Sequence, residues 1–344
     1  MSLPMRISQV MLSKGWGGAE RIFIDLVKGL AEQGVQVQAI MDERFPKKDQ
    51  LEGIANVFPV YMRAFSHWDF FAAHKLKQAI KQFSAELVHC HLSRAALMGG
   101  KAAAKLSIPS VVTTHNNIKL KYCCDIQRFL ILTESQRQYL FANGVSADAI
   151  TKIPNFSNFE PVTELQPRSA PVFVAYGRMV PKKGYEDLVR AFQLVLQQQP
   201  GVRLIIGGDG QEKGKLLALV DELNLAQQIT FSGWVEDVSQ FLAQGSVFVL
   251  PSRNEPFGIV LLEVMASGLP IVTTKTGGAI EILSDDTAYF AELENPASLA
   301  EAMLQGLNDK QRWYKAAQAL SLFNDSYRKG SVIPLTIDYY RSLL

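Results

Sequence analysis

The chain alternates short apolar runs with longer amphipathic runs. In the first half, apolar runs typical of buried strands lie at residues 6–12, 35–41, 87–91, 110–114, 129–133 and 151–153. Amphipathic runs at residues 19–32 and 135–142 have the spacing of helices. Strands that alternate with helical runs predict βαβ units and a parallel sheet.

This alternation stops at residues 156–171 and then begins again. The interruption holds Pro161, Pro167 and Pro171 among mixed polar residues, which indicates a linker. Beyond it, strands are predicted at 172–176, 202–206, 229–231, 247–250 and 270–273, and helices at 185–198, at 215–223 and after each of the last two strands. The tail at 332–344 suits a helix that the second sheet does not need. We therefore predict an α/β protein with two doubly wound domains, divided as 1–158, a linker at 159–170, 171–328, and a final helix at 329–344.

Length and composition agree with two globular domains. The chain has 344 residues, of which 48% are hydrophobic and 20% charged, so a large core is expected and disorder is not. Cys90, Cys123 and Cys124 form neither a disulfide framework nor a zinc pattern, and a reducing cytoplasm is the default expectation. No signal-peptide pattern opens the chain, residues 1–3 are compatible with a cloning remnant, and no apolar run is long enough to span a bilayer.

The charge is uneven along the chain. Residues 1–160 carry a net charge of +6 and residues 161–344 a net charge of −4, which together give the overall +2. A basic first half suits an anionic membrane surface or an acidic acceptor, although chance asymmetry on a solvated face explains it about as well. Nothing in the sequence resembles the basic stripe of a nucleic-acid binder.

Residues 66–83 combine aromatic residues with lysines. Trp68, Phe70 and Phe71 precede Lys75, Lys77 and Lys81. This order suits a helix that rests on anionic lipid. Packing of the aromatic side chains in the core is the alternative that we favour.

The segment Glu255-Pro256-Phe257-Gly258-Ile259-Val260-Leu261-Leu262-Glu263 follows the predicted strand at 247–250. Pro256 and Gly258 indicate a helix start, which places Glu255 in the loop and Glu263 about two turns into the helix. A loop that leaves the carboxyl end of a parallel strand is where open α/β sheets bind ligands, and the N–H groups of a helix start favour phosphate. We therefore expect one carboxylate to face the reacting end of a ligand and the other a hydroxylated end.

A second candidate segment, Gly177-Arg178-Met179-Val180-Pro181-Lys182-Lys183-Gly184, lies between a predicted strand and a predicted helix. Arg178 offers a planar fork to phosphate oxygens and Lys183 a mobile point charge. Together they could offset the charge of a diphosphate leaving group as a divalent metal does elsewhere. The sequence holds no Asp-x-Asp pair, and we expect no metal and no cofactor.

Glycines follow other predicted strands. In Gly15-Trp16-Gly17-Gly18-Ala19-Glu20, the sixth position of the dinucleotide fingerprint is Glu20, which disfavours a nicotinamide enzyme. Gly17 and Gly18 still let the backbone approach a phosphate or sugar, and we favour this role over a plain turn. The segments 207–210 and 277–278 are weaker signals, but on one sheet edge they would help to line a crevice.

Histidines end two of the predicted strands. His115 follows the strand at 110–114, where a lone histidine is more often structural than catalytic. His89 and His91 share one face of a strand, but no third ligand is evident, so we reject a metal site there.

The ordered set of motifs resembles the retaining glycosyltransferases of family four, which have the GT-B fold. The resemblance rests on the segments above and on further ones, namely 88–91, 114–115, 153–155, 250–252 and 265–272, and it covers nearly the whole chain. It implies two Rossmann-like domains that face each other across a cleft, an acceptor-side first domain, a second domain that binds a nucleotide-diphosphate sugar, and a final helix that crosses back to the first domain.

The resemblance also implies roles for individual residues. Arg178 and Lys183 would hold the diphosphate, Glu263 the ribose hydroxyls, and Glu255 the donor-sugar hydroxyls. The remaining implied contacts are the backbone amides of Phe257, Gly258 and Ile259 near the sugar, Val235 near the base, Gly17 and Gly18 near the diphosphate, and His115 near the donor sugar.

These implications lead to a functional hypothesis. The chain is expected to transfer a hexose from a nucleotide sugar, with UDP favoured, to a hydroxyl acceptor with retention of configuration and without a metal. Bacterial cell-envelope glycan or lipopolysaccharide synthesis at the cytoplasmic side of a membrane is the expected setting. The alternatives are a sugar-nucleotide epimerase, a glycan phosphorylase or a catalytically silent nucleotide-sugar-binding subunit. Acceptor predictions carry least weight, because the segment after His115 is short for the family and begins with Asn116 where relatives often have Gly or Asp.

Overall fold

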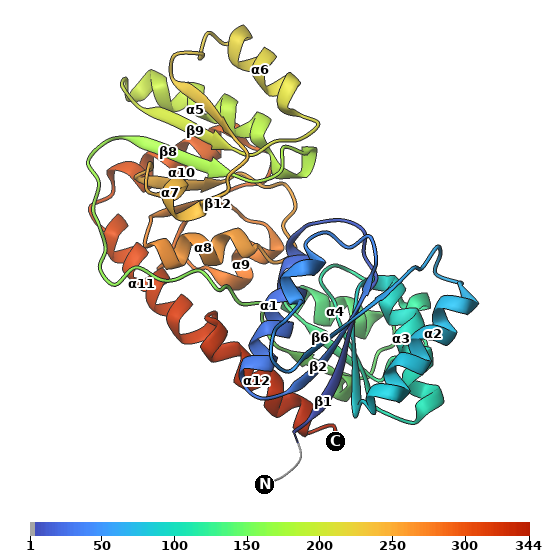
Figure 1. Cartoon of the computed structure of the whole chain (residues 1–344). Coiled ribbons are helices and arrows are strands. Elements are labelled where there is room, and N and C mark those ends of the chain that lie inside the picture. Colours follow the sequence, from blue (N-terminus) through green and yellow to red (C-terminus); the bar gives the residue numbers. More distant parts are fainter. Residues whose placement is uncertain (1–3) are drawn as a thin grey trace. The chain divides into compact units, whose positions relative to one another are not determined.

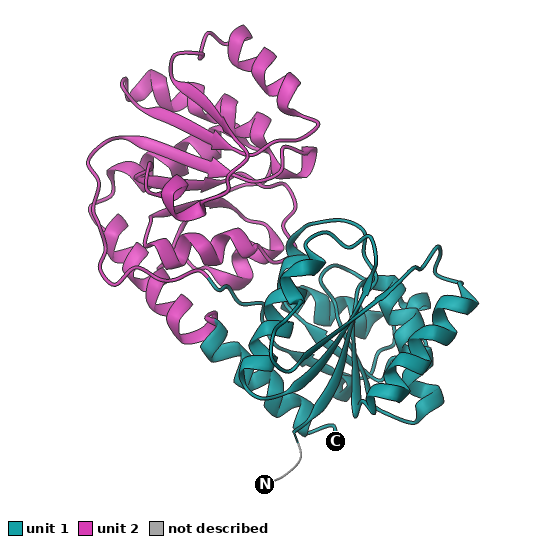
Figure 2. Cartoon of the chain, viewed as in Figure 1, with its two compact units in different colours: residues 1–158, 329–344 teal, residues 159–328 magenta. Residues whose placement is uncertain are grey.

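The computed structural model describes residues 4–344, so the interpretation of residues 1–3 lies outside the described part of the chain. The chain forms two compact units, shown in different colours in Figure 2. Unit 1 comprises the residues up to Asn158 together with Lys329–Leu344. Unit 2 comprises Phe159–Arg328, so the proline-containing segment at 159–170 groups with unit 2.

Unit 1 is built on a seven-stranded parallel sheet in the order β3-β2-β1-β4-β5-β6-β7 (Figure 1). Its strands are β1 (Arg6–Met11), β2 (Gln36–Asp42), β3 (Val57–Met62), β4 (Leu87–His91), β5 (Ser110–Thr113), β6 (Arg128–Ile131) and β7 (Ile150–Lys152). Its helices are α1 (Gly18–Glu32), α2 (Phe70–Phe83), α3 (Leu92–Leu106), α4 (Glu134–Ala142) and α12 (Lys329–Arg341), with short 3-10 turns η1 (Lys48–Leu51), η2 (Leu120–Tyr122) and η3 (Ala147–Ala149).

Helices cover both faces of this sheet, because its strands are apolar on both sides. In β1, Ile7 and Met11 join a core with α1 and α12, whereas Val10 joins a second core with α2 and α3. Alternate residues of a strand point to opposite faces, so one apolar strand contributes to two cores.

Unit 2 repeats the plan with a six-stranded parallel sheet in the order β10-β9-β8-β11-β12-β13. Its strands are β8 (Val172–Tyr176), β9 (Arg203–Gly207), β10 (Ile229–Gly233), β11 (Val247–Leu250), β12 (Ile271–Thr274) and β13 (Tyr289–Ala291). Its helices are α5 (Tyr185–Gln198), α6 (Lys213–Glu222), α7 (Val238–Leu242), α8 (Ile259–Ser267), α9 (Gly277–Ile282), α10 (Pro296–Asn308) and α11 (Arg312–Ser326), with the 3-10 turn η4 (Pro181–Lys183) before α5.

The last helix belongs to the first sheet. Val332, Ile333, Ile337 and Tyr340 of α12 are buried in the core that α12 shares with α1 and β1. A Cβ atom on Gly29 of α1 would lie 2.6 Å from Ile333 Cδ1, so a glycine is needed where the two helices approach. This packing confirms the prediction that the tail returns to the first domain.

Two short strands were not predicted from the sequence. β3 contains Pro59 and lies at the edge of the first sheet, where a missing N–H is tolerated. β13 has three residues and lies at the edge of the second sheet. Pro59 and the exposed positions of β3 obscure its apolar pattern, and β13 is too short to produce a clear period in the sequence.

The prediction for the helix after β11 was wrong at its start. α8 begins at Ile259 and not at Pro256, because Gly258 is the N-cap with a φ of 97° in the left-handed region. Glu263 is therefore the fifth residue of the helix, a little over one turn from its start.

The prediction that the aromatic side chains of residues 66–83 pack in the core was also wrong. Trp68, Phe70 and Phe71 are 60%, 81% and 85% exposed. The buried positions of α2 are Ala72, Leu76, Ile80 and Phe83, so the apolar stripe of the helix does not include its first two residues.

Candidate functional site

The order of strands in unit 2 reverses between β8 and β11. The chain proceeds from β8 outward to β9 and β10, and then returns to place β11 on the other side of β8. Loops leave the carboxyl ends of these two neighbouring strands toward helices on opposite faces, which leaves a crevice where open α/β sheets bind ligands. The loop after β8 carries Arg178 and Lys183, and the loop after β11 carries Glu255.

An ion pair joins the two loops. Lys183 Nζ lies 2.5 Å from Glu255 Oε2, and the two side chains are only 17% and 14% exposed. The structure thus brings together two of the residues that the sequence singled out, although 72 positions separate them. Low exposure strengthens their attraction relative to a surface pair.

Backbone hydrogen bonds fix the same two loops to each other. The amides of Arg253 and Asn254 donate to the carbonyl of Lys182 at 2.9 and 3.2 Å. Gly184, with a φ of 66°, approaches the Pro251 carbonyl so closely that a Cβ atom would collide with it. Glycine is the only residue that meets both requirements without strain.

Arg253 and Asp187 add a second ion pair, which sequence reasoning missed. The guanidinium Nε and Nη2 of Arg253 donate to the two carboxylate oxygens of Asp187, both at 2.8 Å. This bidentate bond to Asp187 raises the pKa of Arg253. The sequence offered one signal for this pair, namely that Asp187 lies in the first turn of a predicted helix and Arg253 in a loop after a predicted strand. The pair connects α5 to the loop after β11 and supports the position of Lys183.

Glu263 is directed to the end of β8. Its side chain is 2% exposed and accepts a hydrogen bond from the hydroxyl of Tyr176, the last residue of β8. The Tyr176 ring packs edge-on against Phe241 and Phe248, with centroid distances of 5.6 and 5.8 Å. Sequence reasoning missed Tyr176, which orients the buried carboxylate at the reversal of the sheet.

Arg178 is exposed at the start of the loop after β8. The loop itself is fixed, because Gly177 N donates to Gly207 O at 3.1 Å and Met179 N donates to Asp209 O at 2.8 Å. Within residues 4–344, no ion pair or hydrogen bond engages the Arg178 guanidinium. A fixed backbone with an uncommitted cation suits recognition of an anion.

The start of α8 offers backbone donors beside the ion pair. Phe257 is buried and packs edge-on against Tyr327, and Gly258 turns the chain into the helix at Ile259. The first N–H groups of a helix have no carbonyl partner within the helix and favour negative charge. Gly278 N of α9 donates to Glu255 O at 2.9 Å and holds the preceding loop in place.

Val235 lies in the loop after β10, at the same edge of the sheet. Its side chain packs so closely on Gly207 at the end of β9 that a Cβ atom on Gly207 would collide with it. Trp234 beside it is 60% exposed. The structure thus places Val235 two strands away from the loop that carries Arg178.

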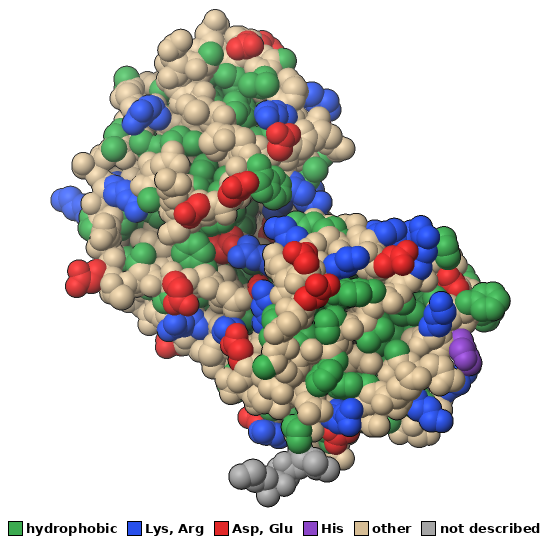
Figure 3. Space-filling model, viewed as in Figure 1, with side chains coloured by type: hydrophobic (Ala, Val, Ile, Leu, Met, Phe, Trp, Pro, Cys, Tyr) green, Lys and Arg blue, Asp and Glu red, His purple; other side chains and the backbone are tan. Residues whose placement is uncertain are grey.

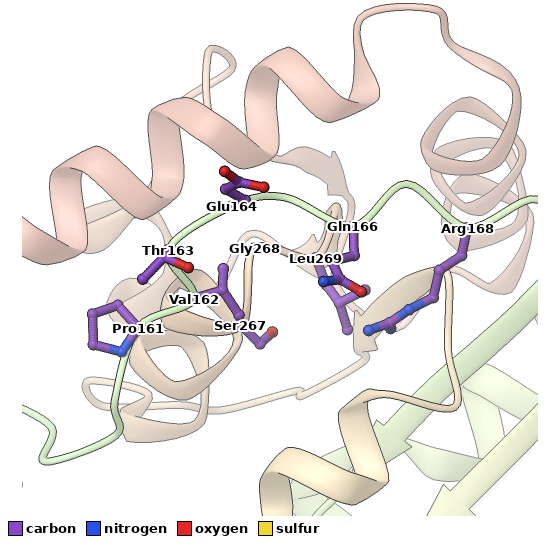
Figure 4. A pocket seen from close by; sticks show the side chains of 9 residues that line it. All are labelled: Pro161, Val162, Thr163, Glu164, Gln166, Arg168, Ser267, Gly268 and Leu269. Atoms are coloured by element: carbon purple, nitrogen blue, oxygen red, sulfur yellow. The ribbon is translucent and has the colours of Figure 1, made fainter.

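Unit 2 also has a pocket away from the ion pair. A pocket of about 460 Å³ is lined by residues of the segment 161–168 and by Ser267, Gly268 and Leu269 (Figure 4). Ser267 is the last residue of α8, and Gly268 and Leu269 follow it, whereas the ion pair lies before the start of α8. The lining contains none of the residues to which the resemblance assigns a role.

In unit 1, Gly17 ends the loop after β1, and Gly18 is the first residue of α1. The strand order of unit 1 reverses between β1 and β4, so this loop also leaves a reversal point. Gly17 is the N-cap of α1, and Glu20 in the first turn accepts a hydrogen bond of 2.5 Å from the Ser13 hydroxyl. Glu20, the residue that departs from the dinucleotide fingerprint, therefore links the first turn of α1 to the loop that precedes it.

His115 follows β5 in unit 1 and is 8% exposed. Its Nε2 lies 3.0 Å from His91 Nδ1. Burial lowers the pKa of His115 to about 4, so the imidazole is neutral at neutral pH. No group of three or more His, Cys, Asp or Glu side chains in the described part of the chain is arranged to hold a metal ion.

Comparisons with known proteins agree with this architecture. The sequence profile described as "Glycosyl transferases group 1" matches residues 158–320, and that described as "Glycosyltransferase Family 4" matches residues 16–160. The lipopolysaccharide core biosynthesis glycosyltransferase LpsE of Rhizobium meliloti is 29% identical over 302 residues, which are 85% of this chain and 86% of that protein.

Two solved structures have the same fold. Anabaena Alr3699/HepE in complex with UDP superposes with a TM-score of 0.87 at 20% identity, covering 98% of this chain and all of that one. The lipopolysaccharide outer core galactosyltransferase WaaB superposes with a TM-score of 0.78 at 18% identity, covering 99% of this chain and all of that one. The two matched profiles and the two parallel sheets together show that this chain belongs to glycosyltransferase family 4, with the GT-B fold.

Proposed function

We propose that this glycosyltransferase moves a hexose from a UDP-sugar to a hydroxyl acceptor with retention of anomeric configuration. The observation that carries the proposal is the Lys183–Glu255 ion pair at the reversal of the second sheet. It pairs a cation suited to a diphosphate with a carboxylate suited to sugar hydroxyls. The presence of UDP in the Anabaena protein of the same fold supports uridine as the base.

The ion pair also suggests how the donor enters. Without a ligand, Lys183 and Glu255 neutralise each other. An arriving diphosphate competes for the Lys183 ammonium, because phosphate oxygens accept strong charge-assisted hydrogen bonds. Glu255 then accepts hydrogen bonds from hydroxyls of the donor sugar. The backbone amides of Phe257, Gly258 and Ile259 help Glu255 to hold the donor sugar. Arg178 binds the same diphosphate as Lys183, and the helix start stabilises its charge.

The ribose is assigned to Glu263. Tyr176 already donates a hydrogen bond to this carboxylate, so the site is built to satisfy a buried acceptor with hydroxyl donors. The two ribose hydroxyls can donate to the same carboxylate. Val235, in the loop after β10, is assigned to the uracil base.

In the transfer step, departure of UDP builds negative charge on the diphosphate. Lys183, Arg178 and the start of α8 stabilise this charge. The acceptor hydroxyl attacks from the side of the leaving group, and a phosphate oxygen takes its proton. Both glutamates position the donor and neither acts as a hydrolytic acid or base. The proposal assigns charge neutralisation to the two cations and requires no metal.

Unit 1 contributes Gly17, Gly18 and His115. The two glycines lack side chains and admit a diphosphate close to the backbone. His115 is assigned to a hydroxyl of the donor sugar.

An anionic membrane surface is the proposed location of the acceptor. Exposed aromatic and basic side chains gather over α2 and α3 of unit 1 (Figure 3). Trp68 and Phe70 also line a groove of about 250 Å³ together with Lys77, Lys101 and Lys105. Aromatic side chains can enter the headgroup region while lysines pair with lipid phosphates. In residues 4–344, no helix is both long enough and apolar enough to cross a bilayer.

We place the acceptor in bacterial cell-envelope glycan or lipopolysaccharide synthesis. The support is the similarity to LpsE, whose name assigns it to lipopolysaccharide core biosynthesis. The basic first half of the chain suits an acidic acceptor of this kind.

The nearest alternatives are a sugar-nucleotide epimerase, a glycan phosphorylase and a silent binding subunit. Release of UDP from UDP-sugar should require an acceptor if the chain is a transferase. The test is to measure UDP with and without a lipopolysaccharide-core acceptor preparation. UDP release without any acceptor indicates a hydrolase, and conversion of the UDP-sugar to its epimer without net UDP release indicates an epimerase. A requirement for inorganic phosphate indicates a phosphorylase, and no release with any acceptor contradicts the proposed transfer.

A further inference from the structure

A continuous chain of buried hydrogen bonds runs through unit 1. It begins at His115, passes through His91 on β4 and Gln9 on β1, and reaches Tyr340 on α12, which in turn contacts His89. Gln9, His91 and Tyr340 are fully buried, and His89 is 1% exposed. The chain therefore connects the ends of neighbouring strands to the last helix, which is more than 200 positions away in sequence.

With the Gln9 amide oriented as in the structure, each hydrogen bond in the chain has one direction. Gln9 Nε2 can only donate, and it lies 2.9 Å from the Tyr340 hydroxyl oxygen. The Tyr340 proton must then go to His89 Nδ1, which lies 2.5 Å away. With Nδ1 of His89 accepting, its Nε2 carries the proton and donates to the Thr113 hydroxyl oxygen at 2.7 Å.

The carbonyl oxygen of the Gln9 side chain determines the protonated nitrogen of His91 and, through it, that of His115. Gln9 Oε1 can only accept, so His91 Nε2, at 2.9 Å, carries a proton. Burial lowers the pKa of His91 well below its ordinary value, so the ring is neutral and its Nδ1 accepts. His115 Nε2, at 3.0 Å from that Nδ1, must therefore donate.

We infer that Tyr340 is a positioning residue that couples the tautomer of His115 to that of His89, and that, with Gln9 oriented as in the structure, His115 is protonated on Nε2 and has a bare Nδ1. In the part of the chain that the structure describes, no hydrogen bond engages His115 Nδ1. This atom can accept a hydrogen bond from a hydroxyl group but cannot donate one. Resting on the proposed function, the inference specifies that His115 receives a hydrogen bond from a donor-sugar hydroxyl.

The same atoms allow one other consistent arrangement, which makes the inference testable. If the Gln9 amide is rotated by half a turn, every hydrogen bond from Thr113 to His115 reverses. His115 then carries its proton on Nδ1 and becomes a donor at that atom. The two arrangements differ at each ring nitrogen, and no mixture of the two satisfies all the buried groups.

Nitrogen-15 NMR of histidine side chains distinguishes the two arrangements in the unmodified protein without any ligand. We expect His89, His91 and His115 to show the Nε2-protonated tautomer at pH 7. Observation of the Nδ1-protonated tautomer at His115 would overturn the inference, whatever the activity of the protein.

Tyr340→Phe tests the link to the last helix. Removing the hydroxyl takes away the partner of both Gln9 Nε2 and His89 Nδ1, so the orientation of the Gln9 amide is no longer coupled to His89. We expect two tautomers of His115 in the NMR spectrum. If they are equally populated, half of the molecules are competent and transfer falls about twofold. An unchanged single tautomer in Tyr340→Phe contradicts the positioning role.

Tyr339→Phe is the matched control. It removes a hydroxyl group from the neighbouring position of the same helix, outside the hydrogen-bonded chain. We expect the His115 tautomer to be unchanged. The activity of His115→Ala separates this inference from the proposed function. If the tautomer is as stated but His115→Ala transfers normally, the hydrogen-bonded chain stands and the assignment of His115 to the donor sugar falls.

Discussion

Lys183 Nζ lies 2.5 Å from Glu255 Oε2, and this ion pair crosses the reversal point of the second sheet. The two residues come from loops that follow neighbouring strands, and the Arg253–Asp187 pair joins the loop after β11 to α5, the helix that follows the other loop. Neither residue is free to move far, so their charges are held where a ligand would meet both. The following predictions test what this arrangement does.

Lys183→Ala should lower transfer about a hundredfold or more. The substitution removes one of the groups that stabilise charge on the departing UDP, and loss of a single such group typically costs this much in kcat. The protein should remain folded, because the site is at the sheet edge and not in the core. Measurements of UDP release and of the unfolding midpoint separate the two effects.

The matched control for that variant is Lys182→Ala. Lys182 is the exposed neighbour in the same loop, and its side chain takes part in no described ion pair. Transfer by this variant should be close to that of the unmodified protein. Equal losses in the two variants would show that only the total charge of the loop matters.

Glu263→Gln should abolish discrimination between UDP and 2′-deoxy-UDP. In the unmodified protein, the buried carboxylate accepts hydrogen bonds from ribose hydroxyls, and loss of one bond to a charged group costs about 1.5–3 kcal/mol. UDP should therefore bind roughly tenfold to a hundredfold more tightly than its 2′-deoxy analogue. Calorimetric titration of both nucleotides measures the difference, and equal affinities in the unmodified protein would refute the ribose assignment.

The buried histidines predict loss of stability in mild acid. Burial lowers the pKa of His115 to about 4 and that of His89 to about 3, whereas a histidine in the unfolded chain titrates near 6.5. The unfolded state therefore binds more protons below pH 6.5. Stability that is fully present above this pH should fall as the pH decreases toward 4, by about 1.4 kcal/mol per pH unit for each such histidine.

Urea unfolding at a series of pH values checks this expectation. The free energy of unfolding should decrease between pH 6.5 and 4, with proton uptake on unfolding. A flat profile across this range would mean that the histidines are already charged in the folded protein.

The exposed aromatic residues of α2 predict binding to anionic vesicles. Phe70→Ser combined with Phe71→Ser should weaken binding to vesicles that contain phosphatidylglycerol, because these side chains are 81% and 85% exposed. Phe141→Ser on α4 is the control, since Phe141 is 65% exposed and lies on a different helix of unit 1. Sedimentation with vesicles measures the effect, and equal losses in both variants would argue against a specific surface.

The sequence predicted the alternating elements well where the strands are buried on both faces. β4, β8 and β11 have the predicted bounds. β8 ends before Gly177 and β11 before Pro251, and these two residues interrupt the apolar runs. The edge strand β3 was not predicted, because Pro59 and the exposed side chains of the strand leave no continuous run of buried apolar residues. The start of α8 was misplaced because Pro256 suggested a helix start, whereas the left-handed Gly258 delays it.

The candidate site was predicted in part. Charged residues after buried strands were visible in the sequence, so Lys183 and Glu255 could be named in advance. Their direct contact could not, because strand order is not contained in a local pattern. Tyr176 and Asp187 were missed for the same reason, since their importance comes from partners that are distant in sequence.

Binding of UDP tests the central claim most directly. With UDP at a hundredfold excess over its dissociation constant, the unmodified protein should be stabilised by about 2.7 kcal/mol, and Lys183→Ala much less at the same concentration. A thermal-shift series with UDP, GDP, ADP and their sugars makes the comparison under one set of conditions. A clear shift with UDP that depends on Lys183 is the predicted result. The absence of a shift with every nucleotide would contradict the account.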